Sequence, residues 1–547
     1  MLVLRKYKTF FLSILISLLA LPAVWDLFPP GLFVSHDGQD HVARIANFYQ
    51  SLAEGNLIPR WAANLNWGFG HPILMFLYPL PSYLASLFHF LNFSLVDSTK
   101  IVFGLGFIFS GISMYLWIKE VWGWEAGLAS GLFYMFAPYR FVDLYVRGAI
   151  GENLAFVWPP LVCWFALKLS QKFKWRYVVG GSLSLAALIL SHNALSLMFL
   201  PLILGYFGYL GHLSKKKFLF AIGYWLLAVF GFAISAFFWF PAFFEGKYTL
   251  RDIVVADDYP SRFRPFKDFI YSPWSYGGAA QLSVQIGVFQ WLAFFLGFYT
   301  FFRFFKKKDK TWILIGGSMV VFLATLFLLL KISLPIWQII TILQKFQFPW
   351  RFLAVMVFIP AVLAGGFVSL WSASQRKWLV AVIAALLLLA NRNYWRAKDF
   401  SFQDDSFYKN VYAGTTDTGE SSPRWSVRFM ERFPEAPMEV IEGKAEIEEV
   451  GRSTTRHEYL VKAETPARLV ENTLYFPGWT VWVDGEQREI QFQDPAHRGL
   501  ITFWVFPGKH QVVVKFGETR LRLFANLVSL GGIVGLIGLG AIIQRRE

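Results

Sequence analysis

Long apolar runs separated by short basic clusters dominate the chain. A membrane-spanning helix needs roughly 20 mostly apolar residues. Runs near that length lie at about 10–25, 101–118, 153–169, 218–240, 286–302, 311–330, 352–371, 378–391 and 521–543. A shorter run at 126–138 must also cross if the basic loops are to share one side. The pattern predicts a polytopic α-helical membrane protein.

Two further apolar stretches allow more than one interpretation. Prolines break residues 73–91, and Ser191-His192-Asn193 interrupts residues 177–209. We expect the first stretch to lie on the membrane surface and the second to form two short helices with the tripeptide in the outer turn. This choice places the lysine- and arginine-rich loops on one side, as the positive-inside rule requires. It gives about 12 transmembrane helices, with the N-terminus and the C-terminus in the cytoplasm.

Composition agrees with this picture. The 547 residues are 56% hydrophobic, with a formal net charge of +15. The positive charge lies in the short loops between spans, which is typical of cytoplasmic loops and does not indicate a nucleic-acid partner. The first apolar run lacks a small-residue cleavage site, so we interpret it as a signal anchor. The single Cys163 allows no intrachain disulfide. We therefore expect a multi-pass protein of the cell (inner) membrane.

This topology divides the chain into three parts. A transmembrane domain at 1–391 carries a long first outer loop at 27–100 and a second outer loop at 139–152. Residues 392–520 form an extracytoplasmic β-rich domain, because short valine-rich segments there are separated by Pro-Gly and Asp-Gly turns. Val481-Trp482-Val483 before Asp484-Gly485 predicts a hairpin in a small β-sandwich. The last span and a basic cytoplasmic tail occupy 521–547.

The most unusual polar cluster follows the first span, where the chain reads Ser35-His36-Asp37-Gly38-Gln39-Asp40-His41 and then Ala43-Arg44. Ionisable groups near the bilayer are rare unless they have a function. A carboxylate of this cluster can act as a general base, and His41 and Arg44 would share the helix face of Asp37. The alternative is that Asp37 or Asp40 only caps an interfacial helix.

The second outer loop holds two arginines and two acids, Arg140, Asp143, Arg147 and Glu152. Guanidinium groups match phosphate oxygens, so the arginines are candidates for binding a phosphate. The acids could orient the arginines, or Asp143 could join Asp37 and Asp40 around a divalent cation (Mg or Mn). Ordinary anchoring at the membrane interface is the alternative.

Two more candidates lie farther along the chain. His192 interrupts apolar sequence and either lines a polar cavity or sits in a helix turn. Arg351 opens a span and is a second candidate for phosphate binding, with snorkelling to the interface as the alternative. The sequence has no Walker loop, no dinucleotide fingerprint and no paired-cysteine metal motif, which argues against a nucleotide-driven pump.

At these residues the chain resembles a known group. Asp37 with His41 and Arg44, the stretch from Tyr139-Arg140 to Gly151-Glu152, and Ser191-His192-Asn193 are similar to the bacterial membrane proteins labelled 6-pyruvoyl-tetrahydropterin synthase related. Phe476-Pro477-Gly478-Trp479 resembles the end of YfhO-type membrane proteins. Both groups look like members of the GT-C superfamily of polyprenyl-phosphate-sugar-dependent glycosyltransferases.

The GT-C resemblance implies a mechanism. Asp37, or Asp40 in its place, would be the general base in the first outer loop, and the sugar would be transferred with inversion. Arg140, Arg147 or Arg351 would stabilise the charge that develops on the lipid phosphate. The partners implied are a polyprenyl-phosphate-linked sugar donor, an extracytoplasmic glycan, lipid or protein acceptor, and membrane lipid.

Two other functions stay open at this point. The protein could be a translocase for a lipid or a lipid-linked glycan without transferase activity. It could also be a non-catalytic surface module whose β-sandwich binds glycan through Trp479 or Trp482.

Overall fold

The computed structural model describes residues 2–255, 259–278 and 281–544. Each of the twelve predicted spans is a helix in this part of the chain. These helices are α1 (Leu2–Val24), α4 (Leu95–Trp122), α5 (Trp124–Met135), α8 (Trp158–Gln171), α9 (Trp175–Ser191), α10 (Asn193–Leu213), α11 (Lys217–Ile234), α15 (Val288–Lys306), α16 (Thr311–Leu329), α19 (Leu353–Ser369), α20 (Ala373–Asn391) and α22 (Arg520–Gln544).

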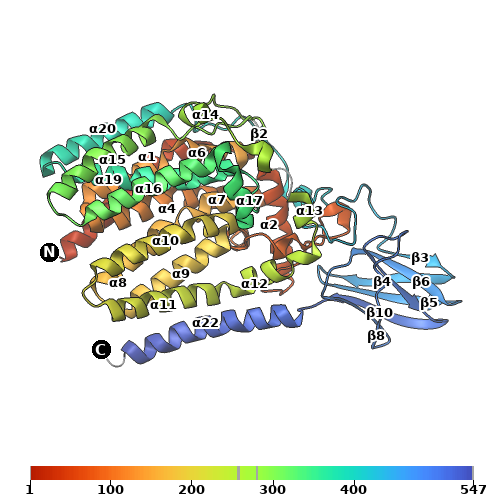
Figure 1. Cartoon of the computed structure of the whole chain (residues 1–547). Coiled ribbons are helices and arrows are strands. Elements are labelled where there is room, and N and C mark those ends of the chain that lie inside the picture. Colours follow the sequence, from red (N-terminus) through yellow and green to blue (C-terminus); the bar gives the residue numbers. More distant parts are fainter. Residues whose placement is uncertain (1, 256–258, 279–280, 545–547) are drawn as a thin grey trace.

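Ten helical stretches in the described residues are long and apolar enough to cross a membrane. The two predicted spans outside these ten are α9, with 17 residues, and α5, with 12. Figure 1 shows that α1 begins and α22 ends at the same end of the bundle, with the β-rich domain beyond the other end. The prediction of a polytopic helical membrane protein with a β-rich domain is confirmed. The end of the predicted C-terminal tail, 545–547, lies outside the described residues.

Both ambiguous stretches fold as the basic loops required. Residues 73–91 contain only a 3-10 turn (Pro72–Met75) and α3 (Leu80–Phe90), whose 11 residues are too few to cross a bilayer. The helical conformation is interrupted between α9 and α10 at His192, whose backbone is extended. Its Nδ1 accepts a hydrogen bond from the Leu195 amide at 3.2 Å. His192 therefore caps α10.

The loops at the β-domain end of the bundle are also helical. After α1 come β1 (Leu32–Phe33) and the amphipathic α2 (Gly38–Ala53), which buries Val42, Ile45 and Phe48. The second outer loop contains α6 (Pro138–Phe141), a π-helical turn at Val142–Arg147 and α7 (Ile150–Ala155). The remaining short helices are α12 (Ala236–Phe244), α13 (Arg251–Val255), α14 (Phe266–Ile270), α17 (Leu334–Ile339), α18 (Thr341–Gln344) and α21 (Asp405–Lys409).

The β-rich domain is a sandwich of two antiparallel sheets. The strands are β3 (Met438–Glu442), β4 (Ala445–Arg452), β5 (Arg456–Ala463), β6 (Ala467–Leu474), β7 (Trp479–Val483), β8 (Glu486–Arg488), β9 (Leu500–Val505) and β10 (Gly508–Phe516). One sheet has the order β4-β5-β10-β7-β8 and the other β3-β6-β9. The predicted hairpin is present, because β7 pairs with β8 and both Asp484 and Gly485 have positive φ, 52° and 84°.

The sandwich starts later than the sequence indicated. Its first strand begins at Met438, whereas we expected β-rich structure from residue 392. Residues 392–437 lie instead across the first outer loop. There, β2 (Phe400–Ser401) pairs with β1, and the Tyr412 and Asn66 amides donate to the Asn64 and Gly414 carbonyls at 2.7 and 2.9 Å. Turn-rich composition marks both kinds of segment, so the boundary was not visible in the sequence.

The sandwich is fixed to the first outer loop. Glu54 Oε2 accepts hydrogen bonds from the Thr454 amide and hydroxyl at 2.8 and 2.5 Å. The Leu474 amide donates to the Phe69 carbonyl at 2.9 Å. Trp61 and Trp479 are both buried and meet edge to face, with ring centroids 5.4 Å apart. Because Trp479 is covered in this way, its ring is not available to bind a glycan.

Candidate functional site

Asp37 lies at the start of α2, where the first and second outer loops meet. The amides of His36 and Asp37 donate to the carbonyls of Val146 and Arg147 at 3.0 and 2.9 Å. Gly148 allows this approach: its φ is +65°, and a Cβ there would lie 2.3 Å from Ser35 Oγ. Asp37 occupies the N-cap position of α2, yet its side chain makes no capping hydrogen bond within the described chain. The simple capping role is therefore not the one this carboxylate adopts.

Asp40 and Arg44 project from α2 toward residues 410–421, which we call the outer strap. The Tyr412 hydroxyl donates to Asp40 Oδ1 at 2.8 Å, and Arg44 Nη2 donates to the Thr416 carbonyl at 2.8 Å. Burial raises the pKa of Asp40 above its ordinary value, although Arg44 and the Tyr412 hydroxyl act in the opposite direction. Asp40 is thus held by the strap, and Asp37 is not.

Four residues of the second outer loop form a buried ionic cluster around Arg147. Its Nη1 lies 2.5 Å from Asp143 Oδ1 and its Nη2 lies 2.7 Å from Glu152 Oε1. The Tyr139 hydroxyl donates to Glu152 Oε2 at 3.0 Å. The side chains of Asp143 and Glu152 are fully buried. Both carboxylates therefore hold Arg147 in place, and its guanidinium has little left for a ligand.

Arg351 and His192 approach the same glutamate from other helices. Arg351 Nε lies 3.4 Å from Glu152 Oε1, and His192 Nε2 lies 3.7 Å from it. Only Nη1 of Arg351 donates hydrogen bonds in the described chain, to the Phe346 carbonyl at 3.0 Å and to Gln347 at 3.4 Å. Arg351 therefore keeps donors for a ligand, unlike Arg147.

Arg140 does not join the cluster. Its guanidinium is fully buried, donates to Ser110 Oγ and Asn153 Oδ1 at 3.2 and 3.1 Å, and lies 4.0 Å from the centroid of the Phe156 ring. These contacts join the second outer loop to α4. The expectation that Arg140 and Arg147 together grip a phosphate does not fit this geometry.

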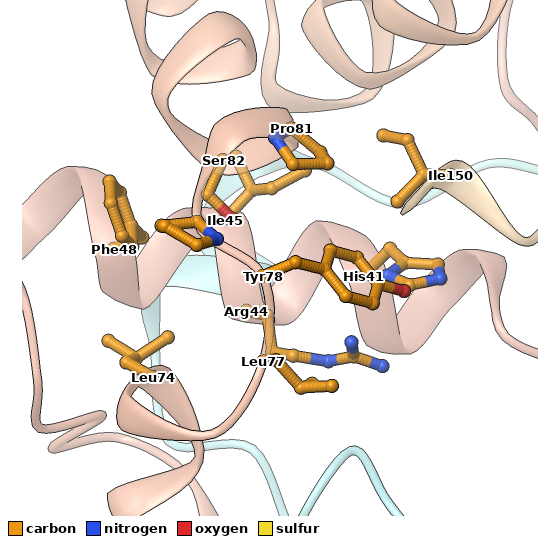
Figure 2. Close-up of a pocket in the computed structure, with 11 residues that line it drawn as sticks. His41, Arg44, Ile45, Phe48, Leu74, Leu77, Tyr78, Pro81, Ser82 and Ile150 are labelled. Carbon is orange, nitrogen blue, oxygen red and sulfur yellow. The ribbon is translucent and has the colours of Figure 1, made fainter. Parts of the chain in front are cut away.

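A pocket lies between α2 and the proline-rich segment that precedes α3. His41, Arg44 and Tyr78 form its polar end, and Phe48 and Leu74 are among its apolar walls. Figure 2 shows Tyr78 and Arg44 extending toward the same side of the pocket as His41. Burial and the neighbouring Arg44 hold the pKa of His41 well below its usual value, so this imidazole is neutral at pH 7. Arg44 Nε is buried and has no hydrogen-bond partner among the described residues.

Tyr78 is a site residue that sequence reasoning missed. Its ring packs against that of His192, with centroids 4.9 Å apart. Gly151 makes this possible, because a Cβ there would lie 2.1 Å from Tyr78 Cε2. Burial raises the pKa of Tyr78 to about 12, so its hydroxyl keeps its proton at neutral pH. The stretch Tyr78-Pro79-Leu80-Pro81 was the only signal, and prolines alone do not show which way a tyrosine points.

The candidate metal ligands are not gathered. Within the described residues, no group of three or more His, Cys, Asp or Glu side chains is arranged to hold a metal ion. Asp143 Oδ1 faces Arg147, and Asp40 Oδ1 faces Tyr412. The trio Asp37, Asp40 and Asp143 therefore does not fit a shared cation.

A family model described as "6-pyruvoyl-tetrahydropterin synthase related domain; membrane protein" matches residues 74–397, more than half of the chain. The chain belongs to this family. The resemblance to 6-pyruvoyl-tetrahydropterin synthase related membrane proteins is thereby confirmed. The matched part of this family member includes the second outer loop, His192 and Arg351, and leaves out α2 and the sandwich.

One relative of this chain is a protein of Lactococcus lactis subsp. cremoris (strain MG1363), described as uncharacterized. The two are 25% identical over 262 residues, which are 46% of this chain and 42% of the relative. The match thus spans less than half of either protein.

Three similar solved structures are an oligosaccharyltransferase, an arabinofuranosyltransferase and ArnT. The apo oligosaccharyltransferase of Archaeoglobus fulgidus has a TM-score of 0.46 and 11% identity, over 77% of this chain and 61% of that one. Arabinofuranosyltransferase AftD from Mycobacteria has a TM-score of 0.43 and 14% identity, over 71% of this chain and 26% of that one. ArnT from Cupriavidus metallidurans, bound to undecaprenyl phosphate, has a TM-score of 0.38 and 14% identity, over 74% of this chain and 68% of that one. Scores this low do not establish a shared fold.

Proposed function

We propose that the protein is a GT-C type membrane glycosyltransferase that moves a sugar from a polyprenyl-phosphate carrier to an extracytoplasmic acceptor. One observation carries the proposal. Asp37 lies against the second outer loop, next to the place where Arg147, Glu152, His192 and Arg351 come together at the end of the membrane helices. A lipid-linked sugar keeps its tail in the bilayer and its phosphate at the interface, so its reaction needs polar groups at this depth.

Asp37 is the general base in this proposal. Its carboxylate accepts the proton of the acceptor hydroxyl while that oxygen attacks the anomeric carbon of the donor. The bond between the anomeric carbon and the phosphate oxygen breaks, the polyprenyl phosphate leaves, and the anomeric configuration inverts. Asp40 is bound to Tyr412 of the outer strap and serves to position α2.

The leaving phosphate needs cations that are not already neutralised. Arg44 has no ion-pair partner among the described residues, and Arg351 shares Glu152 with Arg147, so each keeps donors without protein partners there. Arg147 is committed to Asp143 and Glu152 and positions the loop. Donors directed at charge that develops in the transition state are worth several kcal/mol in a site that excludes water.

The test compares aspartate-to-asparagine substitutions at two positions near the start of α2, each of which replaces one carboxylate oxygen by an amide nitrogen. Asp37→Asn is expected to lower transfer at least about 100-fold, the usual contribution of a general base, with expression and thermal stability unchanged. Asp40→Asn is the matched control and is expected to keep most of the activity. Full activity of the Asp37→Asn protein would overturn the assignment of the base. Transfer that a chelator abolishes would revive the predicted divalent cation.

A further inference from the structure

A second groove lies between the end of α1 and the segment that follows α20, apart from the pocket beside α2. It has a volume of about 750 Å³, within the range of small-molecule sites. Leu18, Leu21 and Trp25 of the first span form one wall, and Arg392 and Arg396 form the other. The described residues that line it include no carboxylate.

The two arginines stand at the depth of lipid headgroups. The two spans beside the groove cover Tyr7–Leu27 and Ala373–Asn391, and Arg392 is the next residue after the second one. Both arginines are exposed. One carboxylate, Asp26, reaches Arg396 Nη1 at 3.0 Å, while its other oxygen accepts from the Ala397 amide at 2.8 Å. The single charge of Asp26 leaves the arginine pair with a net positive charge.

The opposite wall is apolar and extends toward the centre of the membrane. Leu18 and Trp25 expose 56% and 58% of their surfaces. Trp25 follows Leu18 by seven positions, which is about 10 Å of rise along a helix. An anion in water would gain nothing from this wall, whereas a lipid would place its acyl chain along it. Guanidinium groups above the apolar wall of this groove therefore favour a phosphate that carries a hydrocarbon chain.

We propose that this groove binds the headgroup phosphate of an anionic bilayer phospholipid. Arg392 and Arg396 contact the phosphate, and the chain next to it lies against Leu18, Leu21 and Trp25. This binding site is independent of the glycosyl transfer proposed above and does not require it.

Native mass spectrometry of the purified full chain tests the proposal. The protein is titrated with phosphatidylglycerol or with phosphatidylcholine, whose headgroup has no net charge. We expect a preferred phosphatidylglycerol adduct, weakened about tenfold in Arg392→Gln because one charge-assisted contact to phosphate is lost. Lys398→Gln removes the same charge from an exposed residue outside the groove and is expected to change the binding less than twofold.

Three results would overturn the proposal. Equal binding of the two lipids would show that net headgroup charge does not matter. Equal losses of phosphatidylglycerol binding in Arg392→Gln and Lys398→Gln would show that the lipid responds only to the overall positive charge of this surface and not to the groove. Displacement of the lipid by glycerol phosphate at a similar concentration would identify a site for a soluble phosphate. Arg396→Gln, which also frees Asp26, should weaken the adduct as well, and thermal unfolding of each variant checks that it is folded.

Discussion

Removing the guanidinium of Arg147 should destabilise the protein more than removing that of Arg351. Arg147→Gln loses contacts of 2.5 and 2.7 Å to Asp143 and Glu152, both fully buried. Breaking a buried ion pair from one side costs about 3–5 kcal/mol, because it leaves a buried charge without a partner. Arg351→Gln loses a 3.4 Å approach to Glu152 and the Nη1 hydrogen bonds to the Phe346 carbonyl and to Gln347, from a side chain that is 16% exposed. We expect that change to cost less, about 1–2 kcal/mol, because the long approach to Glu152 contributes little and the hydrogen bonds are few.

Thermal unfolding of the solubilised protein, followed by size-exclusion chromatography, measures this difference. Arg147→Gln should unfold several degrees below the wild type, and Arg351→Gln close to it but with much reduced transfer. The double variant Asp143→Asn/Arg147→Gln should recover part of the loss, since neighbouring charges couple by about 0.5–3 kcal/mol. An Arg147→Gln protein that is as stable as the wild type but inactive would refute the reasoning, because Arg147 would then bind substrate.

Four further substitutions test other contacts. Gly151→Ala places a methyl group 2.1 Å from Tyr78 Cε2 and should lower both thermal stability and transfer, as measured on the purified variant. Tyr412→Phe removes the hydrogen bond to Asp40 and should cost about 1–2 kcal/mol. Since that bond stabilises the ionised carboxylate, whose pKa burial raises, the cost should be larger at neutral pH than in acid, which unfolding at two pH values will show. Trp479→Ala should destabilise the sandwich by about 3–5 kcal/mol. Trp482→Ala, at a half-buried position, should cost less, and equal costs would argue against the packing described.

Periodic patterns predicted most of the fold. Each apolar run became a helix, the break at His192 separated two helices, and Asp484-Gly485 formed the expected hairpin turn. These features depend on residues close together in the chain, so local composition specifies them. The start of the sandwich at Met438 was missed, because residues 392–437 are ordered by contacts with a distant loop.

The sequence predicted many of the residues of the candidate site, but it did not predict which of their side chains contact each other. Tyr412 is 372 positions from Asp40, and no local pattern reports such a contact. Arg140 and Arg147 are two α-helical turns apart and were expected to act together. The π-helical turn at Val142–Arg147 has more residues per turn than an α-helix and changes the direction of the second side chain. Arg140 therefore meets Ser110 and Arg147 meets Glu152.

Release of polyprenyl phosphate by the purified protein in lipid nanodiscs is the most direct test of the proposed function. The protein is incubated with a panel of polyprenyl-phosphate sugars and a cell-envelope extract as acceptor, and the freed carrier is measured by mass spectrometry. We predict release that depends on the acceptor and disappears in Asp37→Asn. A wild-type protein that releases no carrier from any donor, yet moves an intact lipid-linked sugar across liposome membranes, would contradict a transferase and identify a translocase.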